Sequence, residues 1–481
     1  MTQAVVTIKV YFDWLNGLWL TDGNPTDTQS LGSVSSFNPG GFTLPADAVS
    51  SNGTLFFGAG GRDNYNLWSV VTQFDGSLTP EGPVSGEMFG EPGDGVYTVH
   101  DAFPSNLIFV NGFTFFDTPS IPAIVLSGQQ PDYGLWATNG TFYGTGMVQH
   151  LDNGLDPFIA PYGPMVNVNG TLFFVGYTSV QAVDATGSAT GFGYELYETN
   201  APQTLALNSD GTLNFSGVTT TLVKDIDPGA GSSLPRDLTA IGNTLFFSAD
   251  DGTDGRQLWK TDGTTIGTVM VADINPGEGA GFDPLDLVND NGTLLFFATD
   301  GTHGYQLWSS DGTAAGTVML TSVDAAGGGI FPLAGTQLTI ANGTAYFIAD
   351  DGTDGPQLWK SDGTAAGTTM VTDINPGEGA GHGLAATALI AAGSRLFFAA
   401  DDGVHGSQLW TSDGSAAGTV MVTDINPGAP ARDSIRPFSP QWDPRCISSP
   451  MTGSPPSCGS RTAPRPEPRF CRASPTSIRQ V

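Results

Sequence analysis

The chain has 481 residues and a formal net charge of −31, and it is rich in glycine (66 residues) and proline (33 residues). So much negative charge excludes a nucleic-acid partner, because proteins bind phosphate groups through Lys and Arg. No run of about 18 apolar residues is present to span a membrane. Lys9 and Asp13 interrupt the apolar stretch that an amino-terminal signal peptide requires. We therefore expect no nucleic-acid partner, no membrane span and no amino-terminal signal peptide.

The first part of the chain, 1–240, contains four degenerate copies of one phrase. They are GLWLTDG at Trp19, NLWSVV at Trp68, GLWATNGTFYGTGMV at Trp136 and ELYETN at Tyr197. The last copy is followed by 201–220, which has turn residues between short apolar runs. We expect that segment to form an added hairpin.

The second part, 241–429, repeats the phrase regularly. QLWKTDGTTIGTVMVADINPG and three close copies carry Trp259, Trp308, Trp359 and Trp410. A period of about 50 residues is typical of β-propeller blades. In the first regular copy we expect strands near 237–241, 243–249, 257–260 and 268–274, separated by Asp-Gly turns. The large aromatic side chains are expected to pack between neighbouring blades, and an aromatic platform for sugar rings is the alternative.

These patterns predict an all-β fold, a β-propeller of four-stranded blades over 1–429. About eight repeat registers are present. Seven or nine blades remain open, because the strand AVVTIKVYF near the amino terminus could pair with the last unit.

The segment 430–481 has a different composition. It holds eight of the 16 Lys and Arg residues and all three cysteines, Cys446, Cys458 and Cys471. The repeat body therefore has no thiol for a disulfide or a metal. Dense proline and basic charge predict a disordered tail.

A second reading frame offers an explanation of this tail. Back-translation of 446–453 with ordinary codons, read two bases on from the Arg445 codon, gives LYFFADDG, and 456–468 gives ELWKSDGTAAGT in the same frame. The restored Trp falls at Gly459, one period after Trp410. We expect the tail to be a frameshifted ninth repeat.

The regular copies resemble a bacterial repeat family with the pattern ELWxxDGTxxGTxxVxDI. The resemblance covers about 240–428 well and 1–240 in patches, with Gln257, Gln306, Gln357 and Gln408 where the family has Glu, and with Glu195 keeping the acid. It implies a propeller-like fold on bacterial surface or secreted proteins, and it carries no shared catalytic residue.

Acidic loops are the candidate metal sites. Closely spaced carboxylates could supply the six to eight oxygens that Ca²⁺ prefers, although Asp and Gly are also the ordinary residues of hairpin turns. The spacing matches neither an EF-hand nor a calcium roll. The candidate ligands are Asp250, Asp251, Asp350, Asp351, Asp401 and Asp402.

Catalytic motifs are missing from the sequence. HExxH, GxSxG and Walker patterns do not occur. His303 and His405 take the register position of Asp254 and Asp354 in sister copies, which indicates a tolerant loop tip. The sequence therefore predicts no catalytic residue and no certain cofactor, with Ca²⁺ as the candidate ion.

We accordingly expect a non-enzymatic extracellular or cell-surface binding and adhesion protein, exported without an amino-terminal signal. Its partner would be a protein or glycan bound at a propeller face. Two alternatives remain open. One is a glycan-active hydrolase or lyase with carboxylates of several blades at the channel, about 5 to 9.5 Å apart. The other is a structural spacer of a larger adhesin.

Overall fold

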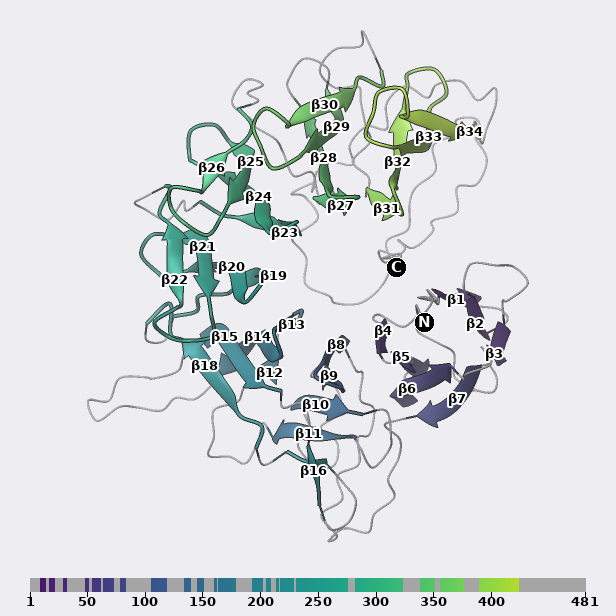
Figure 1. Cartoon of the computed structure of the whole chain (residues 1–481), viewed down its shortest axis with the longest axis vertical. Coiled ribbons are helices and arrows are strands. Elements are labelled where there is room, and N and C mark those ends of the chain that lie inside the picture. Colours follow the sequence, from purple (N-terminus) through teal and green to yellow (C-terminus); the bar gives the residue numbers. More distant parts are fainter. Residues whose placement is uncertain are drawn as a thin grey trace, which may run out of the picture. The chain divides into compact units, whose positions relative to one another are not determined.

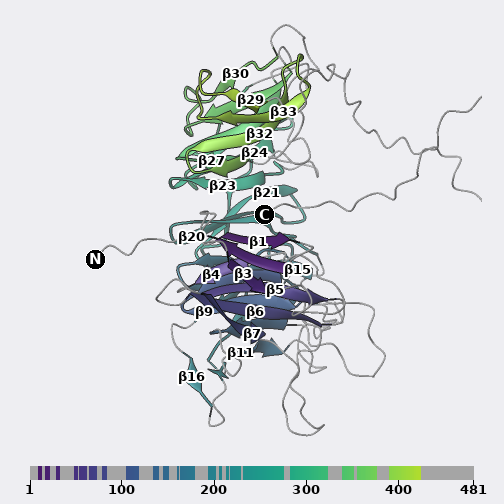
Figure 2. The same cartoon turned by 90° about the vertical axis from the view of Figure 1, so that its right-hand side faces the viewer.

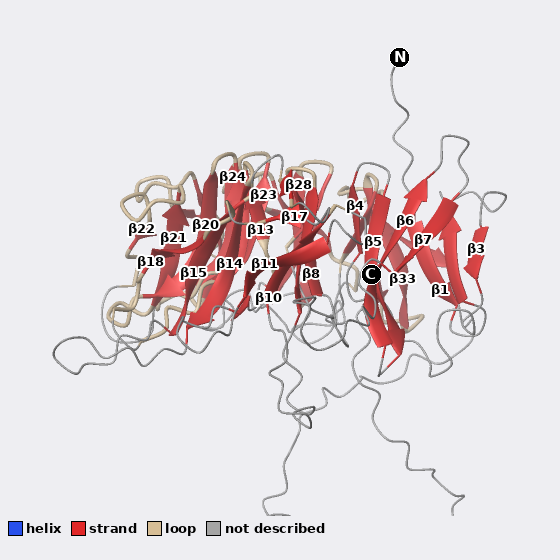
Figure 3. Ribbon diagram, turned by 90° about the horizontal axis from the view of Figure 1, so that it is seen from below, coloured by secondary structure: helices blue, strands red, loops and turns tan. Residues whose placement is uncertain are grey.

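The computed structural model divides the chain into two units, Met1–Ala431 and Arg432–Val481. The structure describes strand backbones between 9 and 83, and then the following ranges: 105–118, 134–139, 145–150, 160–161, 163–178, 193–201, 205–208, 213–215, 217–228, 231–275, 282–322, 338–350, 355–375 and 389–423. The predicted tail, 430–481, lies outside the described residues. Figure 3 shows strands and loops and no helix in the described part, so no described helix could cross a membrane.

The amino-terminal copies each fall in an antiparallel sheet (Figure 1). The first sheet is β1-β2-β3 (Lys9–Asp13, Gly17–Thr21, Gln29–Gly32) and the second is β4-β5-β6-β7 (Ala48–Ser51, Thr54–Gly61, Asn64–Thr72, Leu78–Pro83). The third is β11-β10-β9-β8 (Thr145–His150, Gly134–Thr138, Phe113–Thr118, Ser105–Val110). The fourth is β12-β14-β15-β18 (Ala160–Pro161, Thr171–Thr178, Gly193–Asn200, Thr220–Lys224), with β13 (Val166–Val168) also on β14. The added hairpin is present as β16 and β17 (Ala206–Leu207, Leu213–Asn214).

Each regular copy forms a four-stranded antiparallel sheet in sequence order. The strands of the fifth sheet are β19 to β22 (Arg236–Ile241, Thr244–Asp250, Arg256–Thr261, Val269–Ala272), and those of the sixth are β23 to β26 (Leu285–Asp290, Thr293–Thr299, Tyr305–Ser310, Val318–Met319). The seventh has β27 to β30 (Thr339–Ala341, Thr344–Asp350, Pro356–Ser361, Thr369–Thr372), and the eighth has β31 to β34 (Ile390–Ala392, Arg395–Asp401, Ser407–Ser412, Val420–Thr423). The four strands expected near 237–274 are confirmed.

The repeated phrase DGTxxGT builds the turn between the third and fourth strands. The Asp262 carboxylate accepts hydrogen bonds from the backbone N–H of Thr264 (2.9 Å) and from its hydroxyl (2.7 Å). The Thr264 hydroxyl in turn accepts from Gly267 N–H at 2.9 Å. A Cβ at Gly267 would lie 2.0 Å from the Asp262 carboxylate, so only glycine fits. The same bonds recur in the next three copies, which shows that the phrase encodes a turn.

Neighbouring sheets pack face to face through apolar side chains. Leu196 and Val223 of the fourth sheet share a core with Phe247 and Trp259 of the fifth. Further cores join the third sheet to the fourth and each regular sheet to the next. Figure 1 shows the sheets of β20, β24, β28 and β32 following one another in this order, and Figure 2 gives the view turned by 90° about the vertical axis. Large aromatic side chains in such cores each bury roughly 150 to 250 Å².

The repeated tryptophans belong to these cores. Trp259 and Trp308 are each only 6% exposed. Trp359 and Trp410 are partly buried and pack against the cores of their sheets. Trp308 also lies edge-on to Phe282, with ring centroids 4.8 Å apart. The expected packing role is confirmed, and a row of exposed indoles for sugar stacking is excluded for these four residues.

Hydrogen bonds also join the fifth sheet to the sixth and the seventh sheet to the eighth. Lys260 Nζ donates to the Gly312 carbonyl at 2.8 Å, and Lys360 Nζ donates to the Gly414 carbonyl at 2.8 Å. Both acceptors lie in the turn of the following sheet. First strands of neighbouring sheets are joined as well, because Thr239 Oγ1 in β19 donates to the Leu287 carbonyl in β23 at 2.9 Å.

The fold is therefore all-β, as expected, and its described part contains six four-stranded antiparallel sheets. The described sheets do not join into a closed barrel. Closure into a propeller is not seen among them.

Candidate functional site

Two aspartates occupy equivalent positions in the first strands of neighbouring sheets. Asp237 lies in β19 and Asp286 in β23, each inside a register shift of its strand. Both have left-handed backbones, with φ of 54° and 53°. Aspartate tolerates this conformation better than most residues, and a bulge of this kind re-aims a side chain. Asn106 of β8 has the same geometry, with φ of 53°.

The electrostatic surroundings raise the pKa of both carboxyls. Burial, reinforced by the charge of Asp237, raises the pKa of Asp286 to about 6. Partial desolvation by the surrounding protein also raises the pKa of Asp237, although Arg236 and Arg256 oppose the shift. Asp237 is exposed and accepts a hydrogen bond from the Asp286 backbone. No arginine opposes the rise at Asp286, so its pKa is raised further than that of Asp237.

A supporting group of side chains lies beside this pair. The Arg256 guanidinium donates to the Leu234 carbonyl at 2.8 Å, and its Nε lies 3.9 Å from the Asp283 carboxylate. The Tyr305 hydroxyl donates to the same Asp283 carboxylate. Burial and this bond raise the pKa of Tyr305, and burial lowers the pKa of Arg256. These side chains fix the charge that faces Asp237.

The arrangement can exchange protons near neutral pH. At pH 6 about half of the Asp286 carboxyls carry a proton, since its pKa is about 6. A neighbouring carboxyl under the influence of two arginines is more readily ionised. One group can therefore donate a proton while the other accepts one, which is the requirement for general acid–base catalysis.

Glu195 is a second perturbed carboxyl, in the core of the fourth sheet. It is fully buried at the register position of Gln257, Gln306, Gln357 and Gln408. It accepts hydrogen bonds from the Ser233 N–H (2.8 Å) and hydroxyl (2.5 Å) and from the Ile226 N–H (3.3 Å). Burial raises its pKa to about 7 against the effect of the Ser233 bonds, and the charge of Asp225 adds to the rise.

The loops proposed for calcium use their carboxylates to hold their own backbone. Asp251 accepts from the N–H groups of Thr253 and Asp254, each at 2.9 Å. Asp402 accepts from the N–H groups of Val404 (3.0 Å) and His405 (2.8 Å). Asp250 and Asp401 each accept from the glycine two residues on, at 2.9 Å. Asp350 ends β28, and Asp351 lies outside the described residues.

No three His, Cys, Asp or Glu side chains in the described ranges form a group that could hold a metal. Calcium binding stays a prediction.

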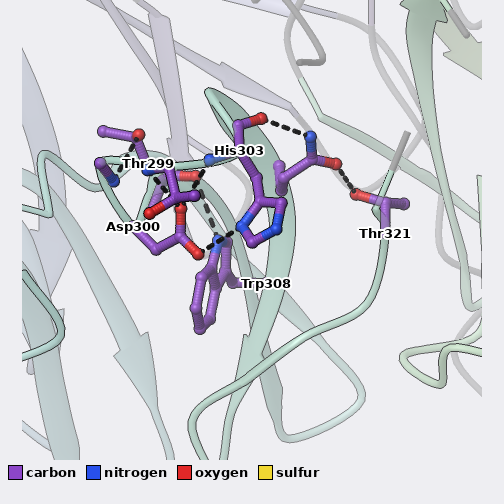
Figure 4. Close-up of polar contacts among 9 residues, drawn as sticks. Thr299, Asp300, His303, Trp308 and Thr321 are labelled. Carbon is purple, nitrogen blue, oxygen red and sulfur yellow. Dashed lines mark hydrogen bonds and ion pairs between the residues drawn. The ribbon is translucent and has the colours of Figure 1, made fainter. Parts of the chain in front are cut away.

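The histidines that looked like tolerant loop residues pair with aspartates. His303 Nδ1 lies 2.6 Å from Asp300 Oδ2, and His405 Nδ1 lies 2.7 Å from Asp402 Oδ2. Figure 4 shows the His303 ring turned toward Asp300, near Trp308. Burial works to raise the pKa of Asp300, but the hydrogen bonds from His303 outweigh it and the pKa is lowered. The pairing was missed because sister copies carry Asp at this position.

Among the comparisons with known proteins, those with solved structures found matches and the others did not. No protein-family description and no curated protein sequence matches the chain. A Mycobacterium tuberculosis puromycin-hydrolyzing peptidase has 12% identity and a TM-score of 0.38, over 78% of this chain and 52% of that one. A prolyl endopeptidase structure has 12% identity and a TM-score of 0.40, over 79% and 49%. A Pyrococcus horikoshii acylaminoacyl peptidase has 11% identity and a TM-score of 0.35, over 79% and 52%. This chain thus spans about half the length of these structures.

The comparisons contradict the expected non-enzymatic role. The similar structures are peptidases and a puromycin hydrolase. The expectation of an adhesion protein, and with it the expectation that the chain is not an enzyme, was wrong on this comparison. Two carboxyls on separate strands, such as Asp237 and Asp286, form no local sequence motif.

Proposed function

We propose that this chain is a glycan-active hydrolase or lyase that uses Asp286 and Asp237 as its acid–base pair. The observation that carries the proposal is the pKa of Asp286, which is raised to about 6 by burial and by the charge of Asp237. Cleavage of a glycosidic bond requires one carboxyl that donates a proton and a second that stays ionised. Asp286 is the proton donor in this scheme, and Asp237 is the base or nucleophile.

The proposal includes a β-propeller as the scaffold. Its support is the repeat of about 50 residues and the face-to-face packing of successive four-stranded sheets. The first strands contact one another along the array, as β13 does with β19 and β19 with β23. In a propeller, first strands surround a central channel. Carboxyls on neighbouring first strands would then face a common space.

The test is release of reducing ends from a panel of polysaccharides by the purified full chain. We expect Asp286→Asn and Asp237→Asn each to lower kcat/KM by roughly 10²- to 10⁴-fold, the usual contribution of a general acid or base. Asp254→Asn is the matched control, since Asp254 lies in a loop where sister copies carry His303 and His405. It should keep full activity.

The pH dependence of kcat/KM gives an independent test of the role of Asp286. Asp286 must be protonated to donate, so kcat/KM should fall as the pH rises through about 6. Asp286→Asn should remove this limb of the profile. Activity that survives both substitutions, or a profile flat across pH 5 to pH 8, would assign the chemistry to other residues. A peptide panel run alongside separates peptide-bond from glycosidic hydrolysis.

A further inference from the structure

The last described sheet has an apolar face that nothing in the described residues covers. In the preceding regular sheets this face is buried against the next sheet, through residues at three fixed register positions. These are Phe246, Leu258 and Val271, then Leu295, Leu307 and Leu320, then Tyr346, Leu358 and Val371. The central leucine is 0% exposed in all three.

The same three positions of the eighth sheet behave differently. Leu409 is 38% exposed and Val422 is 47% exposed, and Phe397 is half-buried. We call Phe397, Leu409 and Val422 the open face. Removing apolar surface from water is favourable, so the fold is stabilised when a partner covers this face. The fifth, sixth and seventh sheets show what kind of partner fits. In each of them, the residues equivalent to the open face are covered by the next sheet of the same repeat.

The covering sheet presents a fixed set of side chains. Four register positions on its second and third strands pack against the preceding sheet, and they are filled in turn by Leu245, Phe247, Ala249 and Trp259; by Leu294, Phe296, Ala298 and Trp308; by Ala345, Phe347, Ala349 and Trp359; and by Leu396, Phe398, Ala400 and Trp410. A partner for the open face therefore needs Leu or Ala, then Phe, Ala and Trp.

The second reading frame of the tail, back-translated with the codons chosen in the sequence analysis, matches this set. In LYFFADDG, aligned on the Asp-Asp-Gly of 401–403, Leu, Phe and Ala fall at the positions of Leu396, Phe398 and Ala400. ELWKSDGTAAGT places Trp one period after Trp410. The first sheet is a poorer match. Its register pairs Tyr11 with Trp19, which puts Lys9 and Asp13 at the positions of Leu245 and Ala249.

We propose that the open face is the docking surface for a ninth four-stranded sheet of the same repeat, with the sequence that the second frame encodes. The partner lies in the same polypeptide once the frame is restored. Docking buries Leu409 and Val422 as Leu358 and Val371 are buried in the seventh sheet.

The experiment compares the present chain with a frame-restored chain in which one base is corrected between the codons of Ala429 and Arg445. Hydrogen exchange of the amides of β33 and β34 should slow by at least about tenfold in the restored chain, as amides do when a sheet leaves the frayed end of an array. Amides of β21 and β22, deep in the array, serve as the internal control and should not change.

A substitution identifies the face. Leu409→Lys should leave the Tm of the present chain unchanged and lower the Tm of the restored chain. Leu358→Lys is the matched control and should lower the Tm of both chains; if it prevents folding, Leu358→Ala replaces it.

Three results would contradict this proposal. An equal drop in Tm from Leu409→Lys in both chains means that another part of the present chain already covers the face. No loss in either chain means that the ninth sheet does not seat there. A dimer of the present chain that Leu409→Lys abolishes assigns the face to a second copy. Each of these three results overturns the proposal.

Discussion

Glu195 is a residue whose chemistry differs from that of its counterparts in the repeat. Four sister positions hold glutamine, and Gln357 shows why: its Nε2 donates to Asp373 at 3.1 Å and its Oε1 accepts from Ile374 N–H at 3.2 Å. Glu195 keeps the acceptor role toward Ile226. As a carboxylate it cannot donate toward Asp225, whose charge instead raises its pKa. The fold therefore favours the protonated form of this side chain.

We expect the free energy of unfolding to fall as the pH rises from the pKa of Glu195 in the unfolded chain to its pKa in the folded chain. Its pKa is about 7 in the folded chain against the ordinary value of 4.5 for a glutamate in the unfolded chain, so between these two pH values the unfolded chain loses the proton first. Below pH 4.5 Glu195 does not change the free energy of unfolding. Above pH 7 its ionisation lowers the free energy of unfolding by the full amount, up to about 3 kcal/mol. Glu195→Gln should remove this cost, and urea unfolding at pH 5 and pH 8 measures it.

Two controls accompany this substitution. Glu198→Gln changes a half-buried neighbour and should give a smaller difference between the two pH values. Gln357→Glu places a carboxyl next to Asp373 in the seventh sheet, and it should make the chain less stable at pH 8 than at pH 5. If Glu195→Gln is no more stable than the parent chain at pH 8, Glu195 ionises without penalty and the assignment fails.

The turn of each regular sheet is the element that the repeat phrase specifies most tightly. In the sixth sheet the Asp311 carboxylate accepts from Thr313 N–H at 2.8 Å, and a Cβ at Gly316 would come within 2.1 Å of it. The hydrogen bonds to Thr313 also lower the pKa of Asp311. The carboxylate and the glycine therefore constrain each other across the turn.

We expect Gly316→Ala to lower the free energy of unfolding by about 1 to 3 kcal/mol, the usual cost of overpacking. Adding Asp311→Ala should recover part of that loss, because the colliding carboxylate is then gone. Gly217→Ala is the control, since a Cβ there meets nothing within 4 Å. A strictly additive double mutant would show that the two residues do not interact.

These elements were the most predictable part of the chain. Asp-Gly turns, short strands and the added hairpin follow from local residue chemistry, and the strands near Trp259 appear where expected. The candidate acid–base pair was not predictable in the same way. Asp237 and Asp286 meet only because two first strands lie side by side and both bulge at the aspartate. The sequence signal for this pair was the dipeptide Asp-Leu, which occurs at the same register position in two copies, at 237–238 and at 286–287.

At the scale of the whole molecule, the acidic loops recur through the regular sheets, and a calcium effect would add up along the array. The structure gives the carboxylates Asp250, Asp251, Asp401 and Asp402 partners in their own loops. The calcium hypothesis predicts that millimolar Ca²⁺, added to chelated protein at constant ionic strength, raises the Tm, because a ligand of the folded state stabilises it. An unchanged Tm, together with no shift in Asp251→Asn, would leave these loops as ordinary turns.

The lysines that fasten one sheet to the next have a consequence for behaviour in solution. Lys224, Lys260 and Lys360 donate to backbone carbonyls of Thr268, Gly312 and Gly414, each at 2.8 Å. A carbonyl carries no net charge, and within the described part of the chain none of these three lysines forms an ion pair with an Asp or Glu. With a formal net charge of −31, molecules of this protein meet as polyanions and repel one another over a distance that shrinks from about 30 Å at 0.01 M salt to about 8 Å at 0.15 M. Dilute buffer keeps them dispersed, and salt lets them approach.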